Sequence, residues 1–473
     1  MDIKTNTLES VETRIQKAID KAHASQDKLN AVVSFIDPCE QIENLKAIDK
    51  SAPLYGVPMA LKDNINTKGI LTTASSRILD NYVPVYDATI VKKLQQAGAI
   101  SIAKASMDEL GMGGTNKNAY RGEVHNAWDT SRISGGSSGG SAVLVASGVV
   151  PFAIGTDTGD SVRKPAAFNG VIGMKPTYGR ISRYGIIPYA SSLDHVGYFT
   201  TAIEDAALLL EVLAGRDDQD MTSSYRKVET YASNINADIT GKKIAIIDNV
   251  QEGVEDSEIK ANFQALMDKL VARGAIVEHI RFQDNLMHAL FPTYYILANA
   301  EATANHSNLD GIRFGMREDG ESVEDVMIHS RTKGFSSYVR KRFVAGSYSL
   351  FVENQEKVFR KAQKVRRLIV EEVQKTLDNY DVIIASASGN IAPLSENSAD
   401  EALSNESMVT ENHMIIGNFG GFPSITIPTG FVKGMPIAIN MSANAFDEQV
   451  LFNIGKAIEE ETKLKGNDSE VKA

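Results

Sequence analysis

Two serine-bearing loops near the middle of the chain contain the residues best suited to chemistry. The first spans residues 134–140 and reads SGGSSGG, with Ser137 at its centre. The second spans residues 156–161 and reads TDTGDS, ending on Ser161. A run of small residues and then an apolar segment separate them, and a helix followed by a strand there would bring the loops together. The two serines are therefore candidates for nucleophilic chemistry, provided that a base lies close by.

The base that such a serine needs is more readily a lysine than a histidine here. The sequence has no G-x-S-x-G turn, and four histidines lie in unrelated settings: His125, His195, His279 and His413. A lysine acts as a base only when neutral, and burial among apolar groups lowers its pKa. Lys62, in the segment VPMALKDNI at residues 57–65, is the lysine best placed for burial. A lysine at a strand end can equally point into solvent, so both interpretations stay open.

The glycine-rich loop itself allows other interpretations. Glycine-rich loops that lead into helices bind phosphates, but residues 135–140 show neither the P-loop spacing nor a spaced Gly-x-Gly-x-x-Gly. A nucleotide site is therefore not favoured. A flexible Gly/Ser connection is the common meaning of such composition. The regular elements expected on either side favour instead a loop whose glycines permit close backbone approach.

The elements that must position these residues follow an α/β order. We expect helices over residues 7–24, 89–98, 141–147, 202–214, 257–272, 354–377 and 446–462, and strands over residues 99–103, 151–155, 243–248, 275–281 and 381–385, with a strand pair in 424–441. Helices that lead into apolar strands recur along the chain, which favours an α/β fold.

The chain shows no internal repeat, low-complexity linker or clean boundary. We expect a single domain over residues 1–462, in which the polar and poorly patterned residues 301–336 are a candidate insertion. Residues 463–473 are a polar tail that we expect to be disordered.

Composition limits the classes of function. With 473 residues, 43% hydrophobic and 23% charged, the chain has the make-up of a soluble globular protein. Its net charge of −11 argues against binding of nucleic acid through a broad positively charged surface. Cys39 is the single cysteine, which excludes an internal disulfide and a cysteine-built metal site and suits the cytoplasm. We expect neither a signal peptide nor a transmembrane helix, because no suitable apolar run occurs.

Three segments together resemble the amidase signature family. They are VPMALKDNI at residues 57–65, GGSSGGSA at 135–142 and GTDTGDSVRKPAAFNGVIGMKPT at 155–177. The resemblance covers nearly the entire chain and implies a large mixed β-sheet covered on both faces by helices. Within the family, four further segments are similar to the glutaminase subunits of tRNA-dependent amidotransferases: Lys175–Gly197, Asp310–Gly315, Ser330–Phe335 and Lys361–Ile369.

The resemblance implies a Ser–cis-Ser–Lys triad, and each member falls on a matching residue. Ser161 would be the nucleophile, Ser137 the bridging serine and Lys62 the base. Neutral Lys62 would take a proton from Ser161 through Ser137 while Ser161 attacks the amide carbon.

The same resemblance implies residues that hold the oxyanion and the substrate. Four backbone N–H groups would form an oxyanion hole: those of Thr158, Gly159, Asp160 and Ser161. For free glutamine, Tyr294 would line the pocket, Arg342 would pair with the α-carboxylate and Glu411 would accept the α-amino group. Without the resemblance, Arg342 could equally be a solvated charge in the basic run 340–342.

The chain also departs from the family pattern. Asp160 stands where the family has a second glycine before the nucleophile, and Lys164 stands where glutamine is usual and could pair with Asp160 across one helical turn. Tyr198 replaces a proline, and Ser386–Asn390 replaces a Pro-Thr-rich loop. Two alternatives to a glutaminase therefore stay open. One is a stand-alone amidase acting on another small amide, and the other is a scaffold protein of the same assembly that is impaired by Asp160.

The resemblance further implies partners rather than cofactors in this chain. A B subunit would bind ATP, Mg²⁺ and the misacylated tRNA, and a small C subunit would complete a heterotrimer. The acidic net charge agrees with tRNA being bound elsewhere.

Overall fold

The computed structural model describes residue 3 and residues 10–397 and 405–464. Most of the polar tail expected at residues 463–473 lies outside the described residues.

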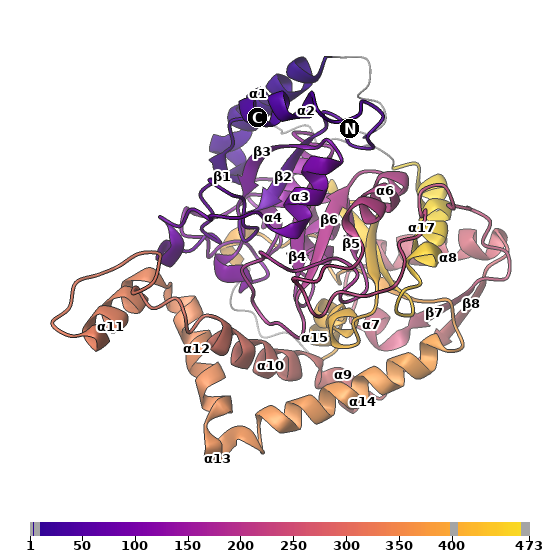
Figure 1. The fold of residues 1–473 in the computed structure, drawn as a ribbon. Helices are drawn as coiled ribbons and strands as arrows, with labels where there is room; N and C mark the ends of the chain where they lie inside the picture. Colours follow the sequence, from indigo (N-terminus) through magenta and orange to yellow (C-terminus); the bar gives the residue numbers. More distant parts are fainter. Residues whose placement is uncertain (1–2, 4–9, 398–404, 465–473) are drawn as a thin grey trace.

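A mixed sheet of eleven strands forms the centre of the described chain (Figure 1). The strands are β1 (Val32–Phe35), β2 (Pro58–Lys62), β3 (Ile100–Ala105), β4 (Phe152–Asp157), β5 (Ile172–Lys175), β6 (His195–Thr200), β7 (Lys243–Ile247), β8 (Ile276–Ile280), β9 (Val382–Ser386), β10 (Ser424–Val432) and β11 (Met435–Ser442), in the order β1-β3-β2-β4-β6-β5-β10-β11-β9-β7-β8. The neighbours β3-β2-β4 and β9-β7-β8 are parallel, whereas the remaining pairs are antiparallel. The expected mixed α/β sheet is confirmed.

Helices occupy most of the connections between these strands. They are α1 (Val11–Leu29), α2 (Cys39–Leu45), α3 (Thr89–Gln96), α4 (Gly139–Ala146), α5 (Arg163–Asn169), α6 (Ile203–Leu213), α7 (Asp248–Glu252), α8 (Ser257–Ala272), α9 (Asp284–His288), α10 (Leu290–Asn305), α11 (Val323–Gly334), α12 (Ser337–Leu350), α13 (Val352–Gln355), α14 (Phe359–Leu377), α15 (Asn405–Asn412), α16 (Ile415–Phe419) and α17 (Glu448–Thr462). Within the described ranges, none of them is long and apolar enough to cross a membrane.

The two faces of the sheet bury different helices, because successive strand residues point to opposite faces. Met59 and Leu61 of β2 pack in one core with α3, α6, α8 and α17. Ala60, between them, packs in another core with α1 and α4. Helices therefore cover both faces, as the resemblance implied.

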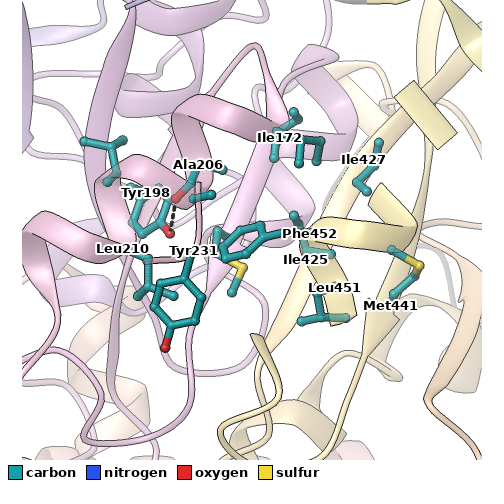
Figure 2. Close-up of a cluster of buried hydrophobic side chains, with 14 of the residues drawn as sticks. Ile172, Tyr198, Ala206, Leu210, Tyr231, Ile425, Ile427, Met441, Leu451 and Phe452 are labelled. Atoms are coloured by element: carbon teal, nitrogen blue, oxygen red, sulfur yellow. Dashed lines mark hydrogen bonds between the residues drawn. The ribbon is translucent and has the colours of Figure 1, made fainter. Parts of the chain in front are cut away.

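Figure 2 shows part of the first of these cores, where β6 meets α6 and α17. The Tyr198 hydroxyl donates a hydrogen bond of 2.7 Å to the Ala206 carbonyl, so the buried phenol has a partner. Tyr231 and Phe452 meet edge to face nearby, with their ring centroids 5.8 Å apart. The tyrosine that departs from the family pattern is thus accommodated by packing in this core.

The helix predicted over residues 354–377 is interrupted near its start. α13 ends at Gln355 and α14 begins at Phe359, because the φ of −113° and ψ of −71° at Val358 lie far from those of an ideal helix. The candidate insertion at 301–336 includes the end of α10 and all of α11, whose N-terminus is capped by Ser322 and Asp325. In Figure 1, α11, α12 and α13 extend away from the sheet.

Candidate active site

Lys62 is the last residue of β2, and its side chain is fully buried. β2 lies between β3 and β4 in the interior of the sheet, and all five of its residues are buried. The alternative in which Lys62 points into solvent is therefore wrong. The local sequence does not reveal this, since it depends on which strands pair on either side.

The Lys62 ammonium or amine group has three oxygen neighbours. Its Nζ lies 2.8 Å from Ser137 Oγ, 2.8 Å from Ser138 Oγ and 3.3 Å from the Thr156 carbonyl oxygen. Burial lowers the pKa of Lys62 to about 7, although nearby carboxylates oppose the shift. A substantial fraction of this lysine is therefore neutral near pH 7, as a base requires.

The two serine loops lie against each other. The Gly136–Ser137 peptide bond is cis, and the Ser138 N–H donates a hydrogen bond of 3.1 Å to the Ser161 carbonyl. Ser137 and Ser161 are both buried, at 2% and 3% exposure. Ser137 contacts Lys62 directly, whereas the Ser161 hydroxyl forms no hydrogen bond to another described residue. The expected approach of the loops is confirmed at the backbone, and Ser161 Oγ stays available.

The backbone N–H groups around Ser161 are also available. Those of Gly159, Asp160 and Ser161 donate to no other group in the described part of the chain. Consecutive unpaired donors beside a nucleophile can stabilise an oxyanion. This is the loop that the resemblance implied for that role.

A buried ion pair between Arg163 and Asp157 holds the second serine loop, residues 156–161. Arg163 Nη2 lies 2.9 Å from Asp157 Oδ1 and also donates to the Gly159 carbonyl at 2.7 Å. Asp157 further accepts from the Val162 N–H at 3.0 Å and from Asn418 Nδ2 at 2.9 Å. Although burial opposes it, the Arg163 guanidinium holds the pKa of Asp157 well below its usual range. The loop that ends on Ser161, the predicted nucleophile, is therefore held at both sides.

Asp108 supports the first loop, and sequence reasoning missed it. Its N–H donates to the Ser137 carbonyl at 3.2 Å, and its Oδ2 accepts from the Asn116 N–H at 3.0 Å. A Cβ added to Gly136 would lie 1.9 Å from that carboxylate oxygen. Burial raises the pKa of Asp108 to about 6. Ser138, which contacts Lys62, was also missed; its place next to Gly139 is a weak signal, and Asp108 lies outside the loop and has none.

Arg342 and Tyr294 come from helices α12 and α10 and lie close to the nucleophile loop. The Arg342 guanidinium donates to the hydroxyls of Tyr189 (2.9 Å) and Tyr338 (2.6 Å), and its buried Nε has no partner. It forms no ion pair with any described carboxylate. The Tyr294 ring would lie 3.0 Å from a Cβ added to Gly159. The structure thus brings both predicted substrate residues to the site.

Glu411 also reaches the site, but its carboxylate is already paired. Lys164 Nζ lies 2.8 Å from Glu411 Oε2, and the Ser388 hydroxyl and Gly389 N–H donate to the same carboxylate at 3.0 Å and 2.7 Å. Although burial opposes it, Lys164 lowers the pKa of Glu411. The predicted pairing of Lys164 with Asp160 is wrong, because the lysine reaches across to Glu411 instead.

A cavity of about 430 Å³ opens beside these loops. Its lining includes Thr158 of the nucleophile loop, Tyr189, which contacts Arg342, and Gly111, which lies close to Ser137. The cavity adjoins the serine loops, but its lining does not include Ser137, Ser161 or Arg342.

Comparison with known proteins agrees with this arrangement. The chain is 43% identical to the A subunit of the glutamyl-tRNA(Gln) amidotransferase of Streptococcus sanguinis, over 91% of this chain and 89% of that protein. It is 40% identical to the protein of the same name from Limosilactobacillus reuteri, over 94% and 92%. The crystal structure of the corresponding Thermotoga maritima protein superposes with a TM-score of 0.84 at 34% identity, covering 100% of this chain and 98% of that one.

A family model described as Amidase matches residues 14–452. That range contains both serine loops, Lys62 and the helices that bring Arg342 and Tyr294 to them. The chain therefore belongs to the amidase family.

Proposed function

We propose that this chain is the glutaminase subunit of a tRNA-dependent amidotransferase. It hydrolyses glutamine and supplies the ammonia with which Glu-tRNA(Gln) is converted to Gln-tRNA(Gln). The observation that carries the proposal is the contact of 2.8 Å between Lys62 Nζ and Ser137 Oγ, on a loop bonded to the backbone of Ser161. The similarity to the amidotransferase A subunits specifies which amide is hydrolysed.

The reaction begins with a proton transfer along the three side chains. Neutral Lys62 accepts the Ser137 proton, and Ser137 accepts that of Ser161, as Ser161 Oγ bonds to the side-chain amide carbon of glutamine. The carbonyl oxygen becomes an oxyanion held by the N–H groups of residues 158–161, where each donor is worth about 3 kcal/mol. Collapse of this intermediate breaks the C–N bond, and the relay returns the proton to the departing ammonia. Water then hydrolyses the glutamyl ester and frees Ser161.

Glutamine recognition uses the residues brought in by the helices. Arg342 has a guanidinium with no carboxylate partner among the described residues, and it pairs with the α-carboxylate of the substrate. Tyr294 lies over Gly159, beside the proposed nucleophile. A partly buried guanidinium that is bonded to no carboxylate is a favourable site for a ligand that supplies a negative charge. This favours glutamine over an uncharged small amide.

The remaining steps belong to partners. A B subunit binds ATP, Mg²⁺ and the misacylated tRNA, and a C subunit completes a cytoplasmic heterotrimer. The similarity to proteins named as subunits supports an assembly. The net charge of −11 supports binding of the tRNA outside this chain.

Ammonia release tests the proposal. The full chain, alone and with its B and C subunits, is given glutamine beside the Ser161→Ala variant. We expect the wild type to release ammonia and Ser161→Ala to lose at least about a thousandfold in rate, since the nucleophile is gone. Equal release by both proteins would contradict the assignment of Ser161. Turnover of simple amides without any glutaminase activity in the complex would favour the stand-alone amidase.

The scaffold alternative rests on the carboxylate of Asp160 beside the oxyanion loop. A negative charge there would disfavour the oxyanion if nothing neutralised it. If Asp160 impairs the enzyme in this way, Asp160→Gly should release ammonia from glutamine faster than the wild type does. A loss of rate in that variant would contradict the scaffold alternative.

A further inference from the structure

We propose that Asp160, rather than Glu411, accepts the α-amino group of the substrate. This inference rests on the proposed function, because it specifies how the same pocket recognises glutamine. It changes the meaning of Asp160 from a hindrance to a determinant of specificity.

Glu411 is poorly placed to accept a further donor. Lys164 neutralises its charge at 2.8 Å, and Ser388 and Gly389 occupy further acceptor positions of the two oxygens. Lys164 is itself held by the Ala387 carbonyl at 3.0 Å and is 5% exposed. A substrate ammonium would have to compete with a geometrically satisfied ion pair whose lysine is buried, which is unfavourable.

Asp160 is in the opposite situation. Its carboxylate forms no hydrogen bond and no ion pair with another described residue, and the residue is partly accessible. It directly precedes Ser161, which is 3% exposed. A partly buried carboxylate without donors is unfavourable by itself, and an ammonium ligand removes that penalty.

The two unpaired charges of the site are complementary. Among the described residues, Arg342 is a cation without a carboxylate, and Asp160 is a carboxylate without a donor. The Tyr294 ring would lie 3.0 Å from a Cβ added to Gly159, the residue before Asp160, and its helix α10 packs against α12, which carries Arg342. An α-amino acid carries one carboxylate and one ammonium on the same carbon, so it satisfies both groups at once. A simple amide satisfies neither.

The ionisation of Asp160 is compatible with this role. Burial raises its pKa to about 6, with Lys164 opposing the shift. The group is therefore mostly charged above pH 7, and a bound ammonium would favour the charged form further. That ammonium would also screen the developing oxyanion from the carboxylate, which removes the objection that a negative charge there must impair the enzyme.

The test compares glutamine with glutaramate, which has the same amide and carboxylate but lacks the amino group. In the full chain with its B and C subunits, Asp160→Asn should lower kcat/KM for glutamine by roughly 10- to 100-fold, the effect of losing a charged hydrogen bond. Turnover of glutaramate should be retained or improved, which also shows that the variant is folded. Asp160→Gly should likewise lose activity on glutamine, whereas an impairing Asp160 would make it gain.

The matched control is the double variant Lys164→Gln with Glu411→Gln, which removes both charges of the pair and leaves Asp160. It should keep the wild-type preference for glutamine over glutaramate. Loss of that preference in the double variant, or its survival in Asp160→Asn, would overturn the inference. Absence of Ser161-dependent ammonia release from glutamine in the wild type would instead overturn the proposed function, and the inference with it.

Discussion

A neutral lysine has two N–H bonds and one lone pair, and the surroundings of Lys62 match this set. Ser138 Oγ and the Thr156 carbonyl can accept the two N–H bonds, and the Ser138 hydroxyl donates to that carbonyl at 3.0 Å, which leaves its oxygen as an acceptor. The lone pair is then directed at Ser137, 2.8 Å away. The contacts therefore orient the base as well as bury it.

Burial of Lys62 has a direct consequence for the pH dependence of the reaction. Because its pKa is lowered to about 7, the neutral form needed for catalysis dominates above that pH and is lost as the pH falls. We expect kcat/KM for glutamine to fall about tenfold per pH unit below about pH 7. Measurement of kcat/KM between about pH 5.5 and pH 9 checks this.

Asp160 also changes its protonation in this pH range, so its contribution to the pH profile must be distinguished from that of Lys62. Its pKa is raised to about 6, so its protonation adds a second loss only at lower pH. In Asp160→Asn, the decline that begins near pH 7 should persist. A rate that stays constant from neutral pH down into the acidic range would show that no group with the pKa of Lys62 is the base.

Ser138 is expected to position Lys62 without touching the substrate. Ser138→Ala removes one acceptor of the amine, so the lone pair is less well directed at Ser137. We expect kcat to fall by about 5- to 10-fold, the value of one hydrogen bond, with KM for glutamine nearly unchanged. Ser138→Thr should restore part of kcat, which a merely structural role would not require. A rise in KM at constant kcat would contradict the positioning role.

Sequence alone indicates the residues proposed to react but not those that orient them. Lys62, Ser137 and Ser161 could be found because each lies in a segment of unusual composition. Asp108 and Ser138 could not, since their contacts depend on how a loop folds over a strand end. The pairing of Lys164 with Glu411 joins residues far apart in the chain. The spacing of Lys164 and Asp160 suggests a local ion pair, but Lys164 pairs with Glu411 instead.

At the scale of elements, the first serine loop depends on close backbone packing. Gly136 N–H donates to the Gly114 carbonyl at 2.8 Å, and a Cβ at Gly136 would lie 1.9 Å from Asp108 Oδ2 and 2.9 Å from the Asn116 nitrogen. Gly136→Ala must displace Asp108 or the loop. We expect a loss of about 1 to 3 kcal/mol in the free energy of unfolding, and loss of most glutaminase activity because Ser137 moves.

The same loop system supplies a matched control. A Cβ at Gly114 would meet no atom within 4 Å. Gly114→Ala should therefore leave both the unfolding midpoint in urea and the activity close to those of the wild type. Equal unfolding midpoints for Gly136→Ala and wild type would contradict the packing argument.

Whether a segment forms a helix or a strand can be predicted from the sequence, whereas which elements pack or pair with it cannot. The helices and strands that the apolar periods predict lie within about five residues of those observed, but more than half of the helices in the described residues, among them α10 and α12, were not predicted. The helix before β9 is interrupted at Val358, where no glycine or proline indicates a break. The order of strands depends on long-range pairing: β5 hydrogen-bonds to β10, and β9 lies between β11 and β7. The pairing of β2 with both β3 and β4 places Lys62 in the interior of the sheet.

At the scale of the whole molecule, the site joins two parts of the fold. Lys62 and the serine loops belong to the sheet, whereas Tyr294 and Arg342 come from α10 and α12, which pack together beside it (Figure 1). Arg342 donates a hydrogen bond to the hydroxyl of Tyr189, which lies in the connection between strands β5 and β6. A bound glutamine would connect these parts through both of its charges.

Ligand binding should therefore stabilise the whole chain against unfolding. In Ser161→Ala, which does not turn the substrate over, glutamine at about 100 times its Kd should add about 2.7 kcal/mol of stability, seen as a rise of a few degrees in Tm. Arg342→Met should abolish the rise, because the α-carboxylate loses its partner. Arg340→Met is the matched control, since Arg340 is exposed on the same helix, and it should keep the full rise. An equal rise in the two arginine variants would show that glutamine binds without Arg342, and that the helices and the sheet are not joined through the substrate.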